Sequence, residues 1–121
     1  VLSSVSASEA IGGVSVTVSA ISLDHAIGRT GASQLAVKID AEGAEVAMLE
    51  SASPATLAAI EDLALEYHDS LVPNARARCE AVLTRAGFMC YAMPFNGHQG
   101  ILVARRPGAW SRLMPARWAE A

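Results

Sequence analysis

The chain has 121 residues, of which 52% are hydrophobic and 17% charged, a composition that predicts one folded domain and excludes a disordered chain. Its net charge of -3 gives no basic field for gathering nucleic acid. No apolar run is long enough to span a membrane and no export signal is recognisable, so we expect a soluble, cytoplasmic protein. Cys79 and Cys90 form no C-x-x-C pair, which predicts two buried free thiols.

The first predicted element is a strand over 14–20, where valines alternate with serine and threonine as in a strand with one buried face. A short helical turn is expected next, with Ser22 as a candidate cap and Gly28 and Gly31 ending it.

Two apolar runs predict the centre of the fold. Residues 35–39 are apolar at every position except Lys38, which predicts a central strand covered on both faces, as in a parallel sheet. Residues 63–67 predict a second covered strand. We expect these two strands to be parallel neighbours.

Helices are predicted between and after these strands. Residues 44–49 suit a short helix, and Gly43 allows the tight turn that precedes it. Ser53 followed by proline predicts the start of a second helix. A third helix is expected over 74–86, with Asn74 as its cap.

The C-terminal part predicts a hairpin. Strands over 88–93 and 101–104 flank Asn96 and Gly97, a dipeptide typical of antiparallel turns. The order of elements predicts an α/β fold with right-handed crossovers. The tail over 107–121 either packs as a short helix or frays.

Polar residues follow both central strands. Asp40 and Glu42 come directly after the first, and Glu66 and His68 close the second. Ligands of open α/β sheets bind beyond the carboxyl ends of the strands, so these side chains are the candidates for a site. We expect Lys38 to pair with one of the acids. The competing interpretation is that Asp40 and Glu42 only stabilise a helix start.

The sequence lacks the common short motifs for metal binding, phosphate binding and nucleophilic catalysis. Asp40, Glu42, Glu66 and His68 could together hold a divalent cation, but no metal-binding spacing supports it, so no metal is expected. His68 by itself is more typical of a surface or supporting histidine. No phosphate-binding glycine loop and no nucleophile elbow occurs.

One segment carries a family resemblance. The string K-I-D-A-E-G-A-E over 38–45 is preceded by I-S-L-D over 21–24 and followed by L-E-Y over 65–67 and R-A-G-F over 85–88. This pattern resembles the C-terminal half of FkbM-type methyltransferases, in which Ala41 is usually valine. The resemblance covers about residues 14–106.

The resemblance implies a class I, Rossmann-like methyltransferase that depends on S-adenosylmethionine. Its seven-stranded sheet ends in an antiparallel hairpin, and this chain would supply the fourth to seventh strands. Residues 1–106 would then be the C-terminal portion of that domain, with 107–121 as a tail. The implied reaction is O-methylation of a small-molecule or glycan hydroxyl.

By the same resemblance, Asp40 lies near the transferring methyl group with Glu42 beside it, and these two are the candidate catalytic residues. Asp40 is the candidate base or acceptor-orienting group. Lys38, Glu66 and His68 are the candidate substrate-binding residues, and His68 is also a weaker alternative base.

Two family features are expected upstream of Val1: the glycine-rich cofactor loop and the acid that holds the ribose. We therefore expect this chain alone to bind S-adenosylmethionine weakly or not at all. The alternative function is a non-catalytic half-domain that folds or acts only with a partner. The unpaired apolar edge at 35–39 would favour self-association. A metal-assisted phosphoryl enzyme using Asp40 and Glu42 ranks last, because no phosphate loop is present.

Overall fold

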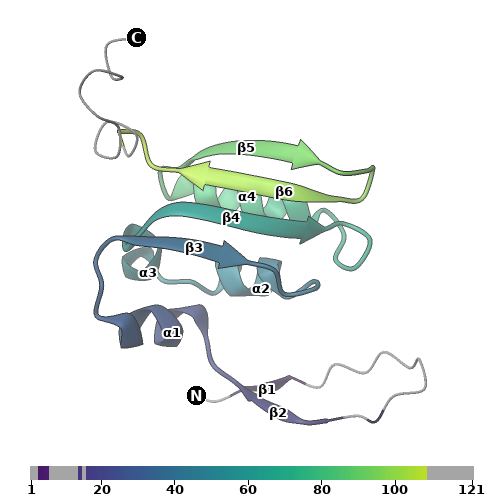
Figure 1. Ribbon diagram of the computed structural model, residues 1–121, viewed down its shortest axis with the longest axis horizontal. Coiled ribbons are helices and arrows are strands. Elements are labelled where there is room, and N and C mark those ends of the chain that lie inside the picture. Colours follow the sequence, from purple (N-terminus) through teal and green to yellow (C-terminus); the bar gives the residue numbers. More distant parts are fainter. Residues whose placement is uncertain (1–2, 6–13, 15, 109–121) are drawn as a thin grey trace.

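The computed structural model describes residues 3–5, 14 and 16–108 (Figure 1). The expectation for the C-terminal tail therefore falls largely outside the described residues. The elements follow one another along the chain in this order: β1 (Ser3–Val5), β2 (Val18–Ala20), α1 (Leu23–Thr30), β3 (Leu35–Ile39), α2 (Glu45–Glu50), α3 (Pro54–Ala58), β4 (Ile60–His68), α4 (Ala75–Arg85), β5 (Met89–Pro94) and β6 (Gln99–Arg105).

The main sheet has four strands in the order β3-β4-β6-β5. Strands β3 and β4 run parallel, with Val37 opposite Leu63 and Ile39 opposite Leu65. Strand β6 is antiparallel to both β4 and β5. The predicted parallel pair, the predicted antiparallel hairpin and the α/β class are all confirmed.

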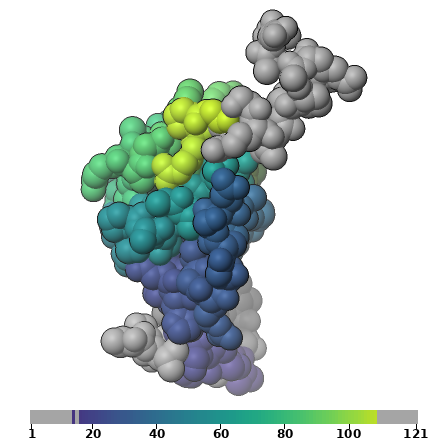
Figure 2. Space-filling view, turned by 90° about the vertical axis from the view of Figure 1, so that its left-hand side faces the viewer, coloured from purple at the N-terminus to yellow at the C-terminus, as the bar shows by residue number. Residues whose placement is uncertain are grey.

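A helical layer covers one face of this sheet. Figure 1 shows α4 behind the strands as drawn, with α2 and α3 beside it on the same side. The largest fully buried apolar side chains come from this layer and from the strand positions that face it: Leu49, Ile60, Leu63, Leu65, Leu83 and Leu102. The space-filling view shows the N-terminal elements at one end of the molecule and the β5–β6 hairpin at the other (Figure 2).

The opposite face of the sheet carries more exposed residues. Met89, Tyr91 and Met93 alternate along β5 and are exposed, while Cys90 and Ala92 between them are partly buried. This is the period of two expected of a strand with a single covered face.

Strand β3 corrects the prediction of a central, doubly covered strand. Within the described part of the chain it pairs only with β4, so it lies at the edge of the sheet. Ala36 and Lys38 are exposed, and Leu35 and Val37 are half-buried. Residues 35–39 read as a covered strand because they are small or aliphatic apart from Lys38, but no described element covers one face of β3.

The N-terminal predictions need two corrections. Within the described residues, Val18–Ala20 is the part of the strand expected over 14–20 that pairs in a ladder, and its partner there is β1. Its valines are exposed because no second layer packs on this two-stranded ribbon among the described residues. Ser22 caps α1 as predicted, accepting from the His25 amide, but the helix runs through Gly28 and ends at Gly31 in the left-handed region.

The predicted N-terminal cap is present in α3 but not in α4. Ser53 caps α3 by accepting from the Thr56 amide at 3.2 Å, as expected. Asn74 occupies the cap position of α4 at φ 57° but makes no capping hydrogen bond. Asp69 does so instead, accepting from the Arg76 amide at 2.9 Å.

Both cysteines are free, and Cys79 is fully buried while Cys90 is partly buried. Burial raises the pKa of the Cys79 thiol to about 12, with a further rise from the nearby Glu45 charge. Neither thiol is therefore activated as a nucleophile. No helix in the described ranges is long and apolar enough to cross a membrane.

Arg106 closes the end of the sheet where β4 begins. Its guanidinium donates to three carbonyl oxygens, those of Leu57 at 2.7 Å, Ile60 at 3.0 Å and Ala86 at 2.8 Å. The same group lies 4.2 Å from the centre of the Phe88 ring. One side chain thus ties the end of α3, the start of β4 and the end of α4 together.

We expect Arg106→Ala to lower the free energy of unfolding by about 2–4 kcal/mol, because three partly buried carbonyls lose their donor. Urea denaturation measures the change. Arg85→Ala is the control: Arg85 is exposed at the end of α4, and its removal should cost less than about 1 kcal/mol. Equal losses in the two variants would contradict this account.

Candidate functional site

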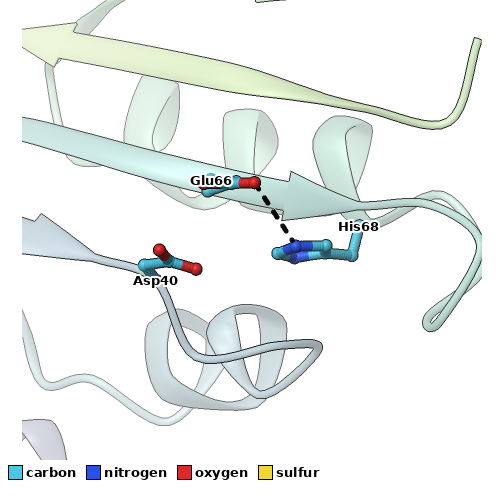
Figure 3. A group of neighbouring side chains, drawn as sticks. All are labelled: Asp40, Glu66 and His68. Atoms are coloured by element: carbon cyan, nitrogen blue, oxygen red, sulfur yellow. Dashed lines mark ion pairs between the residues drawn. The ribbon is translucent and has the colours of Figure 1, made fainter. Parts of the chain in front are cut away.

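The carboxyl ends of β3 and β4 bring three of the predicted site residues together. Ligand atoms of Asp40, Glu66 and His68 lie within 4.8 Å of one another. Figure 3 shows Asp40 at the end of β3 and the His68 imidazole pointing from the end of β4 toward Asp40 and Glu66. The predicted meeting of both polar ends at one edge is confirmed, because parallel strands end on the same side.

The other two predicted residues lie at the margin of this cluster. The Lys38 ammonium is 3.4 Å from the Asp40 carboxylate, which confirms the expected pairing. Both side chains are exposed, so this ion pair adds little stability. Glu42 places a carboxylate oxygen 3.5 Å from Nε2 of His68.

The turn after β3 depends on an unusual backbone. Glu42 has φ 47° and Gly43 has φ 103°, so two successive residues adopt positive φ. A Cβ at position 43 would lie 3.3 Å from the Leu71 Cβ, at a φ that side chains rarely adopt. Glycine at this position therefore permits the turn that leads into α2.

A fully buried carboxylate organises this turn. Glu45, the first residue of α2, accepts hydrogen bonds from the amides of Ala41 at 3.1 Å and Gly43 at 3.0 and 3.1 Å. Its Oε1 also lies 3.2 Å from Nδ1 of His68. Glu45 was not among the predicted site residues. The signal was an acid in the first turn of a helix that follows a glycine turn.

His68 is buried, with 4% of its surface exposed. A carboxylate only accepts hydrogen bonds, so Nδ1 of His68 is the donor in the contact with Glu45. Nε2 has no hydrogen-bond partner among the described residues. The nearest acidic oxygens, of Glu42 and Glu66, are 3.5 and 3.7 Å away.

Glu66 is held from a third strand. Its Oε1 accepts a hydrogen bond of 2.6 Å from the Gln99 side chain at the start of β6. The Glu66 side chain is 20% exposed, between buried His68 and exposed Asp40. Solvent exposure in the cluster thus increases from His68 through Glu66 to Asp40.

Searches of family models, curated proteins and solved structures found no match to this chain. The chain is an α/β domain with a mixed four-stranded sheet. A candidate site with two acids and a histidine lies at the carboxyl ends of its parallel pair of strands.

We expect Glu45→Gln to lower the free energy of unfolding by about 2–4 kcal/mol, because an amide replaces a buried oxygen that accepts hydrogen bonds from backbone amides and lies beside His68. Chemical denaturation gives the value. Glu80→Gln is the matched control, since Glu80 is 38% exposed and pairs only across α4 with Arg76. The control should change stability by less than about 0.5 kcal/mol, and a similar small effect at position 45 would contradict the organising role.

Proposed function

We propose that this chain forms the C-terminal half of a class I methyltransferase domain and provides the acceptor side of its active site. The observation that carries the proposal is the placement of the K-I-D-A-E-G-A-E segment. Its Asp40 lies at the carboxyl end of β3, beside Glu66 and His68 of the parallel neighbour β4. The terminal antiparallel hairpin of β5 and β6 also agrees with the sheet that the family resemblance implies.

The reaction is O-methylation with S-adenosylmethionine as donor. The bond between sulfur and the methyl carbon breaks as the acceptor oxygen bonds to that carbon, and the sulfonium becomes a neutral thioether. The acceptor hydroxyl must lose its proton to a base. Asp40 suits this role because its carboxylate is exposed at the site, while Glu42 and Glu66 orient the acceptor.

His68 is the second candidate for the proton. Its Nε2 faces Glu42 and Glu66, and Glu45 fixes the ring by its contact with Nδ1. Burial keeps this nitrogen away from bulk water, so it would receive a proton only through a group that reaches into the cluster. Asp40 remains the first choice because it is directly accessible.

The test of this function is Asp40→Asn in the protein or complex that carries the cofactor-binding half. We expect single-turnover methyl transfer to fall about 10²- to 10⁴-fold while the affinity for S-adenosylmethionine changes less than about threefold. The Asp40–Lys38 ion pair is exposed and adds little stability, so the melting temperature should stay nearly constant. Glu80→Gln serves as the surface control.

Unchanged methyl transfer in Asp40→Asn would show that Asp40 has only a structural role.

A separate calorimetric titration of the 121-residue chain with S-adenosylmethionine tests the half-domain part of the proposal. No glycine-rich cofactor loop occurs in this sequence, so weak or absent binding is expected. Tight stoichiometric binding would contradict it.

The second candidate function is a half-domain that acts by association. The observation that favours it is the edge of β3, with which no strand other than β4 pairs in the described part of the chain. The Leu35 amide donates to the Ala59 carbonyl, and alternate residues of a parallel strand bond on the same side. The amides of Ala36 and Lys38 therefore face the open edge.

We expect the chain to self-associate through this edge at high micromolar concentration, as measured by sedimentation velocity. Ala36→Pro should reduce association without removing a bond to β4, because proline is tolerated where the amide faces away from the sheet. The control is Ser70→Ala, because Ser70 is exposed and lies outside every strand. A second proline at Ala58 would not serve as a control, because Ala58 lies within α3. A clean monomer of the unaltered chain would contradict the prediction.

A further inference from the structure

One buried nitrogen in the site lacks a hydrogen bond among the described residues. The His68 side chain is only 5% exposed, and its Nε2 has no hydrogen-bond partner among the described residues. Buried polar atoms in folded proteins are almost always paired, so an exception at a candidate site is a place where a water molecule or an ion can bind. Figure 3 shows this nitrogen on the side of the ring that faces Asp40 and Glu66.

The other ring nitrogen is arranged as in metal-binding histidines. Nδ1 contacts the Glu45 carboxylate at 3.2 Å, and Glu45 is itself fixed by the amides of Ala41 and Gly43. A carboxylate bound to one imidazole nitrogen sets the tautomer and the ring orientation, which leaves the other nitrogen ready to coordinate a cation. This feature is independent of the acids on the opposite side of the ring.

Those acids supply the remaining ligands. Oxygens of Asp40 and Glu66 lie within 4.8 Å of each other and of the imidazole, and Glu42 approaches Nε2 at 3.5 Å. Among the described residues, Lys38 contacts Asp40 with its exposed ammonium, and no lysine or arginine ion pair is seen at Glu42 or Glu66. Carboxylates gathered around one buried nitrogen repel one another unless a positive charge lies between them.

We propose that Asp40, Glu66 and His68 bind one divalent first-row metal ion. A mixed set of one imidazole and two carboxylates suits ions such as Mn²⁺ and Zn²⁺. Ligand atoms bound at about 2.1 Å lie at most about 4.2 Å apart, so the carboxylates must move inward slightly. Asp40 can do this because it is exposed, and its lysine partner can turn into solvent.

The site escapes sequence motifs because its ligands come from two strands that are distant along the chain. Short metal motifs place two ligands on one helix or loop, whereas here the parallel pairing of β3 with β4 brings Asp40 to the other two. The inference does not depend on methyl transfer, since it concerns the binding of a metal ion by the chain alone.

The first test is a titration of the chelator-treated 121-residue chain with Mn²⁺, in which electron paramagnetic resonance measures the free ion. We expect saturation at a single ion per chain, and Asp40→Asn or Glu66→Gln should weaken binding at least about tenfold. Glu80→Gln should leave the affinity unchanged within about twofold. No binding by the unaltered chain, or equal binding by Asp40→Asn, would overturn the proposal.

The second test needs no variant, so it stands even where a substitution harms folding. In a chain with ¹⁵N-labelled histidines, stoichiometric Zn²⁺ should shift the Nε2 resonance of His68, whereas exposed His25 and His98 serve as internal controls. Equal responses of all three histidines would indicate surface binding and overturn the proposal. So would a His68 ring that stays protonated on both nitrogens at saturating Zn²⁺, because a proton would then occupy the place assigned to the metal ion.

Discussion

The buried Glu45 carboxylate is the interaction on which the geometry of the site depends. A charge removed from water is tolerated only where donors surround it, and here two backbone amides contact it together with an imidazole nitrogen. The amides belong to the turn after β3, and the imidazole belongs to the end of β4. One carboxylate therefore links the two strand ends that carry the candidate site and holds the imidazole of His68 in place.

The two ends of the parallel pair are stabilised in different ways. At the start of β4, the Arg106 guanidinium donates to carbonyls of three separate segments and covers the Phe88 ring. At the other end, the polar atoms around His68 are only partly satisfied. Side chains thus join separate segments at both ends, and the acids and the buried His68 nitrogen that could bind a ligand lie at the end opposite Arg106.

The proposed methyl transfer and the proposed metal site use the same cluster and are chemically compatible. A cation held by Asp40, Glu66 and His68 would lower the cost of removing a proton from a hydroxyl bound to it. Asp40 would then act as a ligand, and the proton would leave through Glu42 or solvent. Without a cation, Asp40 itself is the accessible base. Metal dependence of the methyl transfer rate separates these two arrangements.

Local patterns in the sequence predicted the parallel pair, the terminal hairpin, the cap at Ser53 and the acids at the strand ends. They could do so because hydrophobic periodicity, turn residues and short motifs depend only on residues close together in the chain. Only the tertiary structure decided that β3 lies at an edge, that Asp69 and not Asn74 caps α4, and that Arg106 joins three segments. The same holds for the burial of His68 against Glu45 and for its unpaired nitrogen. These features arise from contacts between residues far apart along the chain, and burial and pairing at such contacts depend on how whole elements pack rather than on any local pattern.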